Sequence, residues 1–325
     1  MKRSSGRSAR VCAAAIAALI SLHAAQGLAA DAAEPPYDPP VGSRWIILSE
    51  ANSDEVRPDG PQTSLIKSRA ELTIDAKTAE GFQITYVNRG TTVEGNARML
   101  PLVRSSVKAL ENVPIRATTD LAGKPVRVDN LDEAKAAMRN MAGSLTAQFQ
   151  DKPQVLALLN QMISGLIEVD AGKAASAYIE DVPTLAKAQN TGMKPGEVRR
   201  TSKAANNPLG GGELKSNDTF EMTEADATTG RLKFVDTTSY DAASMKDFLQ
   251  SLGKRVAAAS GDSIKPEQID SLLGSMVFSL DERTEFEVED GMTRKVSEKS
   301  VTVVRALGHN LSKTETKTVT VTRAP

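Results

Sequence analysis

Strict alternation between apolar and polar residues runs through most of this 325-residue chain. Phe82, Ile84 and Tyr86 alternate with polar neighbours, and the same pattern fills the tail from Val277 to Thr322. A period of two places successive side chains on opposite faces of a β-strand, one face buried and the other in water. Threonine, which is common at the wet positions, suits such half-buried surfaces. The pattern therefore predicts a large antiparallel sheet.

Segments with helical periodicity interrupt these strands. Asn130, with Glu133 three residues later, predicts a capping box, and apolar residues then recur at helical spacing as far as Phe149. Further helices are expected at 99–111, after Pro153, at 171–179, after a cap at Asp241 or Ser244, and after Pro266. The predicted fold class is α+β: a large twisted antiparallel β-sheet, similar to an open half-barrel, with amphipathic helices packed on one face.

Residues 1–30 have the three parts of a secretory signal peptide. A basic start precedes the apolar run from Val11 to Leu22, and small residues precede the cleavage that we expect near Ala29 or Ala30. The apolar run is shorter than the ~20 residues that a membrane-spanning helix needs. We therefore expect a periplasmic or secreted protein that does not span the membrane after cleavage.

Removal of the signal peptide changes the charge and the redox chemistry of the chain. Four of the 40 basic residues and none of the 41 acidic residues lie within it, so the net charge moves from −1 to −5. A chain without a basic excess is not expected to bind nucleic acid. The one cysteine, Cys12, also leaves, so the mature chain is cysteine-free and must be stabilised by packing instead of disulfides.

Two regions are expected in the mature chain: a Pro-rich leader, residues 31–42, and a single α+β domain, residues 43–325. The leader contains four prolines between Ala32 and Pro40, a composition that favours an extended spacer.

The domain reads as two similar halves, residues 43–190 and 191–325. Buried-face positions match at an offset of 150 residues; Ile84, for example, corresponds to Phe234. Two interpretations are open: a duplication whose halves pair into one continuous sheet, or chance similarity between repeated hairpins.

The sequence offers few groups for catalysis or metal binding. His309 is the one histidine left after cleavage, and no serine lies in a Gly-x-Ser-x-Gly motif. The acidic run from Asp281 to Asp290 could hold a cation, but nearby Arg283, Arg294 and Lys295 favour a solvated strand face with cross-strand ion pairs. We therefore expect no enzyme activity, no catalytic residue, no metal site and no cofactor.

The order of elements over residues 41–323 resembles that of the periplasmic lipoprotein carriers, in which helices close an open half-barrel. The resemblance is one of architecture, without a shared residue motif. It implies a non-enzymatic envelope protein that carries a lipid or another apolar ligand.

Flexible methionines on apolar helix stripes are typical of adaptable ligand pockets. The sequence thus predicts an apolar pocket between the helices and the sheet, lined by Met138, Met141, Leu145, Leu159, Met162 and Leu166. The alternative is that these stripes complete the core of a structural or protein-interaction module, which would bind an envelope protein partner and no small ligand.

Overall fold

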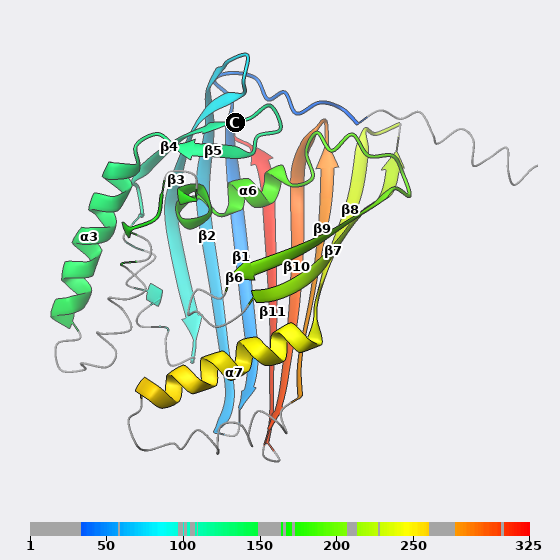
Figure 1. Ribbon diagram of the computed structural model, residues 1–325. Coiled ribbons are helices and arrows are strands. Elements are labelled where there is room, and N and C mark those ends of the chain that lie inside the picture. The colour runs from blue at the N-terminus through cyan, green and yellow to red at the C-terminus, as the bar shows by residue number, and fades with distance from the viewer. Residues whose placement is uncertain are drawn as a thin grey trace, which may run out of the picture.

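A computed structural model describes residues 34–325, except position 58, most of 97–109, most of 149–172, 207–212, 227, 260–276 and 307–308. Within these residues the chain forms one antiparallel sheet of 11 strands, and a few helices lie against it (Figure 1). The large antiparallel sheet is confirmed. The α+β prediction overstated the helices, because the described protein is mostly sheet.

The sheet consists of two meanders, β1–β5 and β6–β11, which are joined where the first strand of the chain, β1, pairs with the last, β11. The strands are β1 (Arg44–Arg57), β2 (Gly60–Lys77), β3 (Phe82–Gly95), β4 (Pro114–Thr119), β5 (Pro125–Val128), β6 (Val198–Asn206), β7 (Glu213–Asp226), β8 (Arg231–Tyr240), β9 (Val277–Glu289), β10 (Met292–Ala306) and β11 (His309–Arg323). Their order is β5-β4-β3-β2-β1-β11-β10-β9-β8-β7-β6, so the sheet remains open, with edges at β5 and β6.

Pairing of β1 with β11 makes the sheet continuous. The register places Ile47 opposite Val321 and Ala51 opposite Lys317. All the remaining neighbours in the sheet are strands that follow one another in the sequence, and most of these are linked by short connections. The duplication of the two halves remains a prediction, because a continuous meander needs no repeated sequence.

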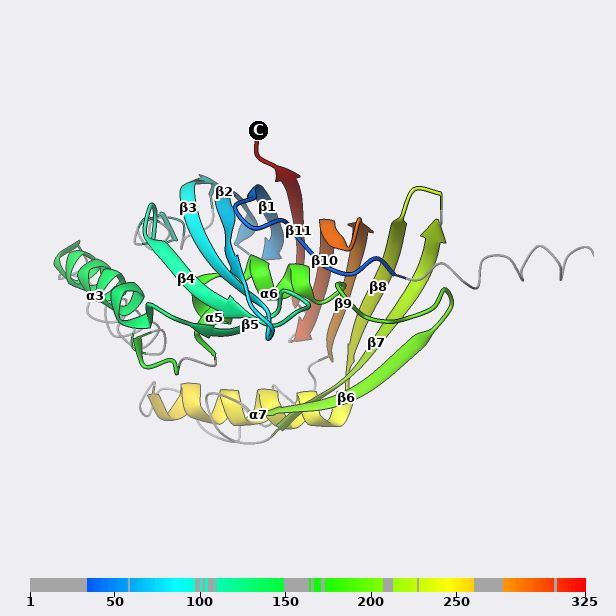
Figure 2. The ribbon, with the colours of Figure 1, turned by 90° about the horizontal axis from the view of Figure 1, so that it is seen from above.

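The described helices are α3 (Leu131–Gln148), α5 (Ala174–Tyr178), α6 (Asp181–Ala186) and α7 (Ala242–Ala259). Seen from above, the sheet forms an arc, with α5 and α6 inside it and α7 across its open side (Figure 2). In contrast, α3 lies beyond β4, at one end of the arc. The helices predicted after Pro153 and Pro266, and most of the one at 99–111, lie outside the described residues. None of the described helices has the length and hydropathy that spanning a membrane requires.

The two helix starts for which a side-chain cap was predicted are both found, but one of them lacks the predicted cap. The Asp241 carboxylate accepts a 2.7 Å hydrogen bond from the Ser244 amide, as expected of an N-cap. The Asn130 side-chain oxygen accepts instead from the Arg116 amide of β4, and its Nδ2 donates to Glu133 Oε2 at 2.9 Å. Asn130 therefore ties α3 to the sheet and does not form the predicted capping box.

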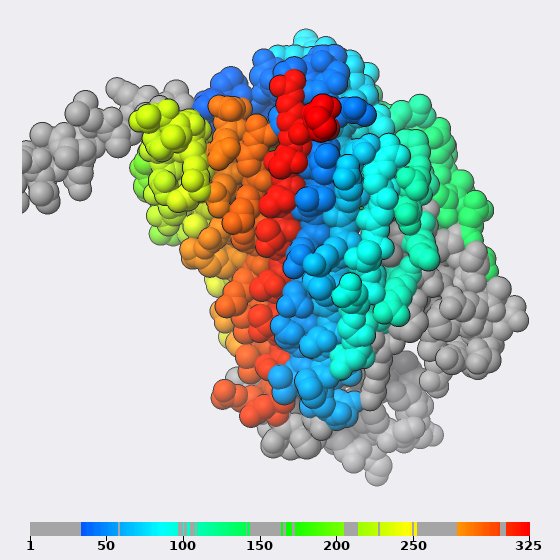
Figure 3. Space-filling view, turned by 180° about the vertical axis from the view of Figure 1, so that it is seen from behind, coloured from blue at the N-terminus to red at the C-terminus, as the bar shows by residue number. Residues whose placement is uncertain are grey.

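The concave and convex faces of the sheet differ sharply in chemistry. Buried residues on the concave face form one core, which includes Ile47, Phe234 and Phe286. Figure 3 shows the convex face, on which β11 lies between β1 and β10. Near the C-terminal end of β11, threonines alternate with buried valines. This is the one-sided burial that the alternation predicted.

The leader packs against the rim of the sheet from residue 34 onward. Tyr37 is buried, and its ring meets the Phe82 ring edge-to-face with centroids 5.3 Å apart. Its amide donates to Asn190 Oδ1 at 2.6 Å, and Glu34 Oε2 accepts hydrogen bonds from Thr191 Oγ1 and the Gly192 amide, both at 2.8 Å. Residues 34–40 thus form part of the folded domain, where the sequence suggested a spacer.

Candidate functional site

One of the six side chains predicted to line a pocket is described by the structure. Met138 on α3 is buried within the core. The side chains of Met141 and Leu145, and all of Leu159, Met162 and Leu166, lie outside the described residues. The apolar pocket between these helices and the sheet therefore stays a prediction.

The predicted solvated face of β9 is present. Glu287 forms ion pairs with Arg231 of β8 and with Lys295 of β10, and Arg283 pairs with Glu285 on its own strand. Arg294 differs from the expectation, because its guanidinium lies over the Trp45 ring, 4.6 Å from the centroid. Within the described residues no three His, Cys, Asp or Glu side chains are grouped to hold a metal ion.

A hollow of about 340 Å³ lies on the concave face, bounded by strands β1–β4 and by the α5–α6 segment; we call it the first hollow. Its apolar wall is formed by Ile66, Tyr86, Leu110, Val113, Ile115 and Ala177. Its polar end is formed by Ser49, Ser68, Glu180, Asp181 and Lys317. A pocket with one apolar wall and one charged end suits an amphipathic molecule.

Lys317 is central to the polar end. Its ammonium lies 2.8 Å from Glu180 Oε1 and 2.9 Å from Asp181 Oδ1, and Asp181 is almost completely buried. Burial opposes the charged form of Lys317, but the two carboxylates outweigh burial and raise the pKa of Lys317. The pKa of the nearby Tyr86 phenol is raised by burial and by the same two carboxylates.

A second hollow of about 480 Å³ adjoins the first and shares Ala51, Ile66 and Lys317 with it. Its concave lining is hydroxylic and acidic: Ser53, Ser64, Thr284, Ser300, Glu282, Glu298 and Glu315. Glu298 lies directly opposite Lys317 in the β10–β11 ladder, yet forms no ion pair or hydrogen bond with any described residue. Burial, together with the Asp181 and Glu180 carboxylates, raises the pKa of Glu298, although Lys317 partly opposes the shift.

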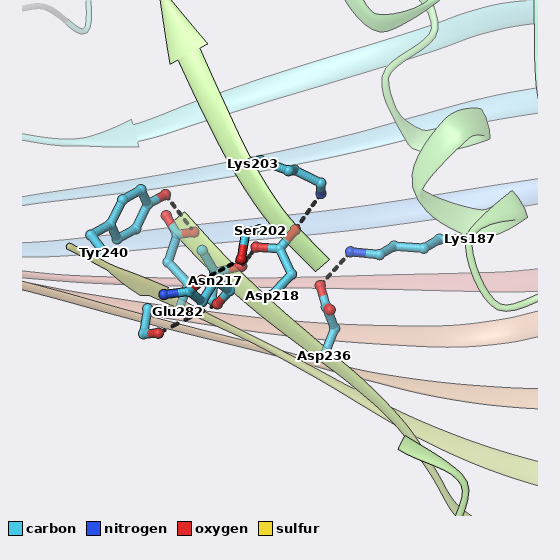
Figure 4. A network of polar contacts seen from close by, with 10 residues as sticks. Lys187, Ser202, Lys203, Asn217, Asp218, Asp236, Tyr240 and Glu282 are labelled. Atoms are coloured by element: carbon cyan, nitrogen blue, oxygen red, sulfur yellow. Dashed lines mark hydrogen bonds and ion pairs between the residues drawn. The ribbon is translucent and has the colours of Figure 1, made fainter. Parts of the chain in front are cut away.

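Carboxylates on β7 and β8 continue the polar surface, but each has its own cation (Figure 4). Lys187 pairs with Asp236, and Lys203 of the edge strand β6 pairs with Asp218. Burial opposes ionisation of Asp218, but hydrogen bonds from Lys203 and Thr238 lower its pKa overall. These carboxylates are neutralised locally, in contrast to Glu298.

Glu282 of β9 accepts a 3.0 Å hydrogen bond from the Tyr240 hydroxyl (Figure 4). Burial and this carboxylate raise the pKa of Tyr240 to about 12, so the phenol remains a donor at neutral pH. Glu282 forms no ion pair within the described part of the chain. Together with Glu298 it gives the second hollow two carboxylates without a direct cationic partner.

The sequence did not reveal this site, although one feature could have indicated it. Lys313, Glu315, Lys317, Val319 and Val321 alternate in phase along β11, so the charged residues occupy the same face as the buried valines. A strand whose buried-face positions change from apolar to charged must leave the hydrophobic core or line a polar cavity. Here it lines the two hollows.

Replacement of Glu298 with Gln is expected to flatten part of the pH dependence of stability. Because the pKa of Glu298 in the folded state lies above its ordinary value of 4.5, folding favours the protonated form, and wild-type stability decreases as the pH rises through the raised pKa. The variant should be more stable than the wild type near about pH 8 and equal to it near about pH 4. Urea unfolding at both pH values measures this difference. Glu285→Gln, on the convex face of β9, controls for net charge; an identical effect there would refute the assignment.

Comparisons with known proteins give no family for this chain. No protein-family model matches the sequence, and no curated protein is similar to it. Among solved structures, one of lipovitellin, titled for its lipid–protein interactions, aligns over 89% of this chain and 26% of its own length, with 10% identity and a TM-score of 0.39. The chain therefore spans about a quarter of the lipovitellin polypeptide.

Two bacterial protein structures align at still lower similarity. The COG4313 outer membrane channel from Pseudomonas putida F1 matches 88% of this chain and 97% of its own, with 7% identity and a TM-score of 0.19. OpdL from Pseudomonas aeruginosa matches 87% and 99%, with 6% identity and a TM-score of 0.21. Scores this low do not establish a common fold.

Proposed function

We propose that this protein is an exported, non-enzymatic binding protein that holds a small amphipathic ligand, such as a lipid, on the concave face of its sheet. The single observation that carries the proposal is the first hollow, in which an apolar wall on β2–β4 faces the charged end around Lys317 and Asp181. A volume of about 340 Å³, extended by the adjoining 480 Å³, lies in the range of small-molecule sites.

Export and the absence of catalysis rest on the sequence. Residues 1–30 support export because they have the basic, apolar and small-residue parts of a signal peptide. A non-enzymatic role is supported by the lack of a nucleophile motif and by a mature chain with one histidine and no cysteine.

The test is a titration with the fluorescent apolar probe N-phenyl-1-naphthylamine. Ala51 lines both hollows, so Ala51→Trp should fill their junction and weaken probe binding by about tenfold or more. Leu48→Trp places the same side chain on the same strand but on the convex face, where Leu48 is exposed, and should bind like the wild type. If Ala51→Trp does not fold, Ser68→Tyr in β2 tests the same space. Equal binding by all variants would refute the proposal.

The alternative of a protein-interaction module is favoured by one observation. The edge strand β6 pairs with β7 alone among the described strands, so its other edge can accept a further strand from a partner. Its exposed basic residues, including Arg200, suit an acidic extended segment. Co-purification of a protein instead of a small molecule would support this function.

A further inference from the structure

We infer that the two hollows select a ligand whose polar end is cationic, an amine or ammonium group on an apolar chain. The inference rests on the proposed function and specifies its ligand class. The carboxylates that line the hollows are Glu180, Asp181, Glu282, Glu298 and Glu315. Lys317 has its side chain among them, and Lys313 neutralises Glu315 at 2.7 Å. The lining also includes Arg283 and Lys299, but strand alternation places both side chains on the convex face, where Arg283 pairs with Glu285. The lining therefore carries an excess of negative charge.

The buried end of the first hollow has an acceptor that is ion-paired but not hydrogen-bonded. The Asp181 side chain is 6% exposed, and its Oδ1 lies 2.9 Å from the Lys317 ammonium without accepting a hydrogen bond from any described residue. Lys317 is shared with Glu180, so one ammonium faces two carboxylates. A carboxylate has room for several donors, so Asp181 Oδ1 can accept a hydrogen bond from a ligand. A donor with positive charge would supply that hydrogen bond and add a second cation beside the two carboxylates.

The second hollow also favours a ligand with a positive charge. Glu298 and Glu282 have no ion-pair partner among the described residues. Glu298 lies opposite Lys317 in the β10–β11 ladder, and Glu282 lines the second hollow from β9. Burial is the main cause of the raised pKa of Glu298; the Asp181 and Glu180 carboxylates add to it, and Lys317 and Lys187 oppose it. A cation placed beside the Glu298 carboxylate would be attracted to it directly.

The apolar chain of such a ligand has a place next to these charges. Ile66 belongs to both hollows, and the wall continues through Tyr86, Ile115 and Val113 in the first hollow. A chain along this wall would bring its terminal ammonium to the junction, within reach of Asp181 and Glu298. A fatty-acid carboxylate at the same position would face the acidic lining and would be repelled.

The experiment compares three ligands of one chain length as competitors of N-phenyl-1-naphthylamine at neutral pH: decylamine, decanol and decanoate. At this pH the amine is cationic and the acid anionic. Decylamine should displace the probe at a concentration at least about tenfold lower than decanoate, with decanol between them. If decanoate competes as well as decylamine, the charge preference is refuted and the proposed function stands. If none of the three displaces the probe, the proposed function fails as well.

Charge-removing variants identify the groups responsible. Asp181→Asn and Glu298→Gln keep the shape of the side chains and should each weaken decylamine competition by about fivefold or more, while competition by decanol stays unchanged. Glu285→Gln removes the same charge from the convex face of β9 and should leave all three competitors unchanged. An equal effect of all three variants on decylamine would show a general charge effect and would contradict the assignment to the hollows. A melting curve for each variant confirms that it is folded.

Discussion

Replacing Lys317 with Met is expected to lower the free energy of unfolding by about 3–5 kcal/mol, the range found when one partner of a buried ion pair is removed. The ammonium lies 2.8 Å from Glu180 Oε1 and 2.9 Å from Asp181 Oδ1. Water can replace the ammonium only in part, because the Asp181 side chain is only 6% exposed. Methionine is similar in size to lysine, so the decrease in the free energy of unfolding would come from the lost charge more than from lost packing. Urea unfolding near neutral pH measures the change.

Lys313→Met provides a matched control. Lys313 lies on the same strand and the same face, four residues earlier, but its pair with Glu315 is largely exposed, at 36% and 48% of the two side chains. Exposed pairs contribute about 0–1 kcal/mol, so this variant should remain close to the wild type. Adding Asp181→Asn to Lys317→Met should recover part of the lost stability. Equal, small losses in both lysine variants would mean that the Lys317 cluster is solvated.

The second large effect is expected for Gly291→Ala, with a loss of about 2–4 kcal/mol in the free energy of unfolding. Gly291 turns the chain between β9 and β10 with a φ of 74°, a conformation that disfavours L side chains. A Cβ there would also lie 2.2 Å from the Pro36 carbonyl oxygen, so the leader would have to leave the rim. Tyr37 would then lose its burial against Phe82.

Gly230→Ala separates backbone strain from loss of the leader. Gly230 turns the chain between β7 and β8 with a φ of 67°, and its added Cβ would meet nothing closer than 3.8 Å. Strain alone should cost about 1–2 kcal/mol. Limited proteolysis should release the leader from Gly291→Ala and not from Gly230→Ala. Equal losses of stability with an intact leader in both variants would show that residues 34–40 contribute nothing to the fold.

Local features of the fold could be predicted from the sequence because their causes are local. The period of two identified the buried positions Phe286 and Val288, and Gly123 marked the turn between β4 and β5. Asp241 was one of two residues expected to cap α7, and its carboxylate does so. In each case neighbouring residues determine the conformation.

The parts that were missed depend on contacts between distant residues. The β1–β11 pair joins residues that are more than 250 positions apart, and no local pattern specifies which strands become neighbours. Asn130 was expected to cap its own helix, but the Arg116 amide competes for its side-chain oxygen. The leader has the composition of a spacer, and its contacts with distant residues, the packing of Tyr37 on Phe82 and the hydrogen bonds of Glu34, show that it belongs to the domain.

The charged site was missed for a related reason. Alternation distinguishes the two faces of a strand, and a charged residue on such a strand is normally assigned to the face that is exposed to solvent. Lys317 and Glu298 lie instead on the concave face, where the arc and the α5–α6 segment enclose them. Enclosure is a property of the whole sheet, so the sequence pattern alone could not distinguish a polar cavity from open solvent.

The most direct measurement for the central claim is mass spectrometry of organic extracts of the protein purified from cells that produce it naturally. The account predicts about one amphipathic small molecule per chain in the wild type. It predicts a strongly reduced amount in Ala51→Trp and an unchanged amount in Leu48→Trp. An extract without any such molecule, or the same amount in both variants, would contradict the account.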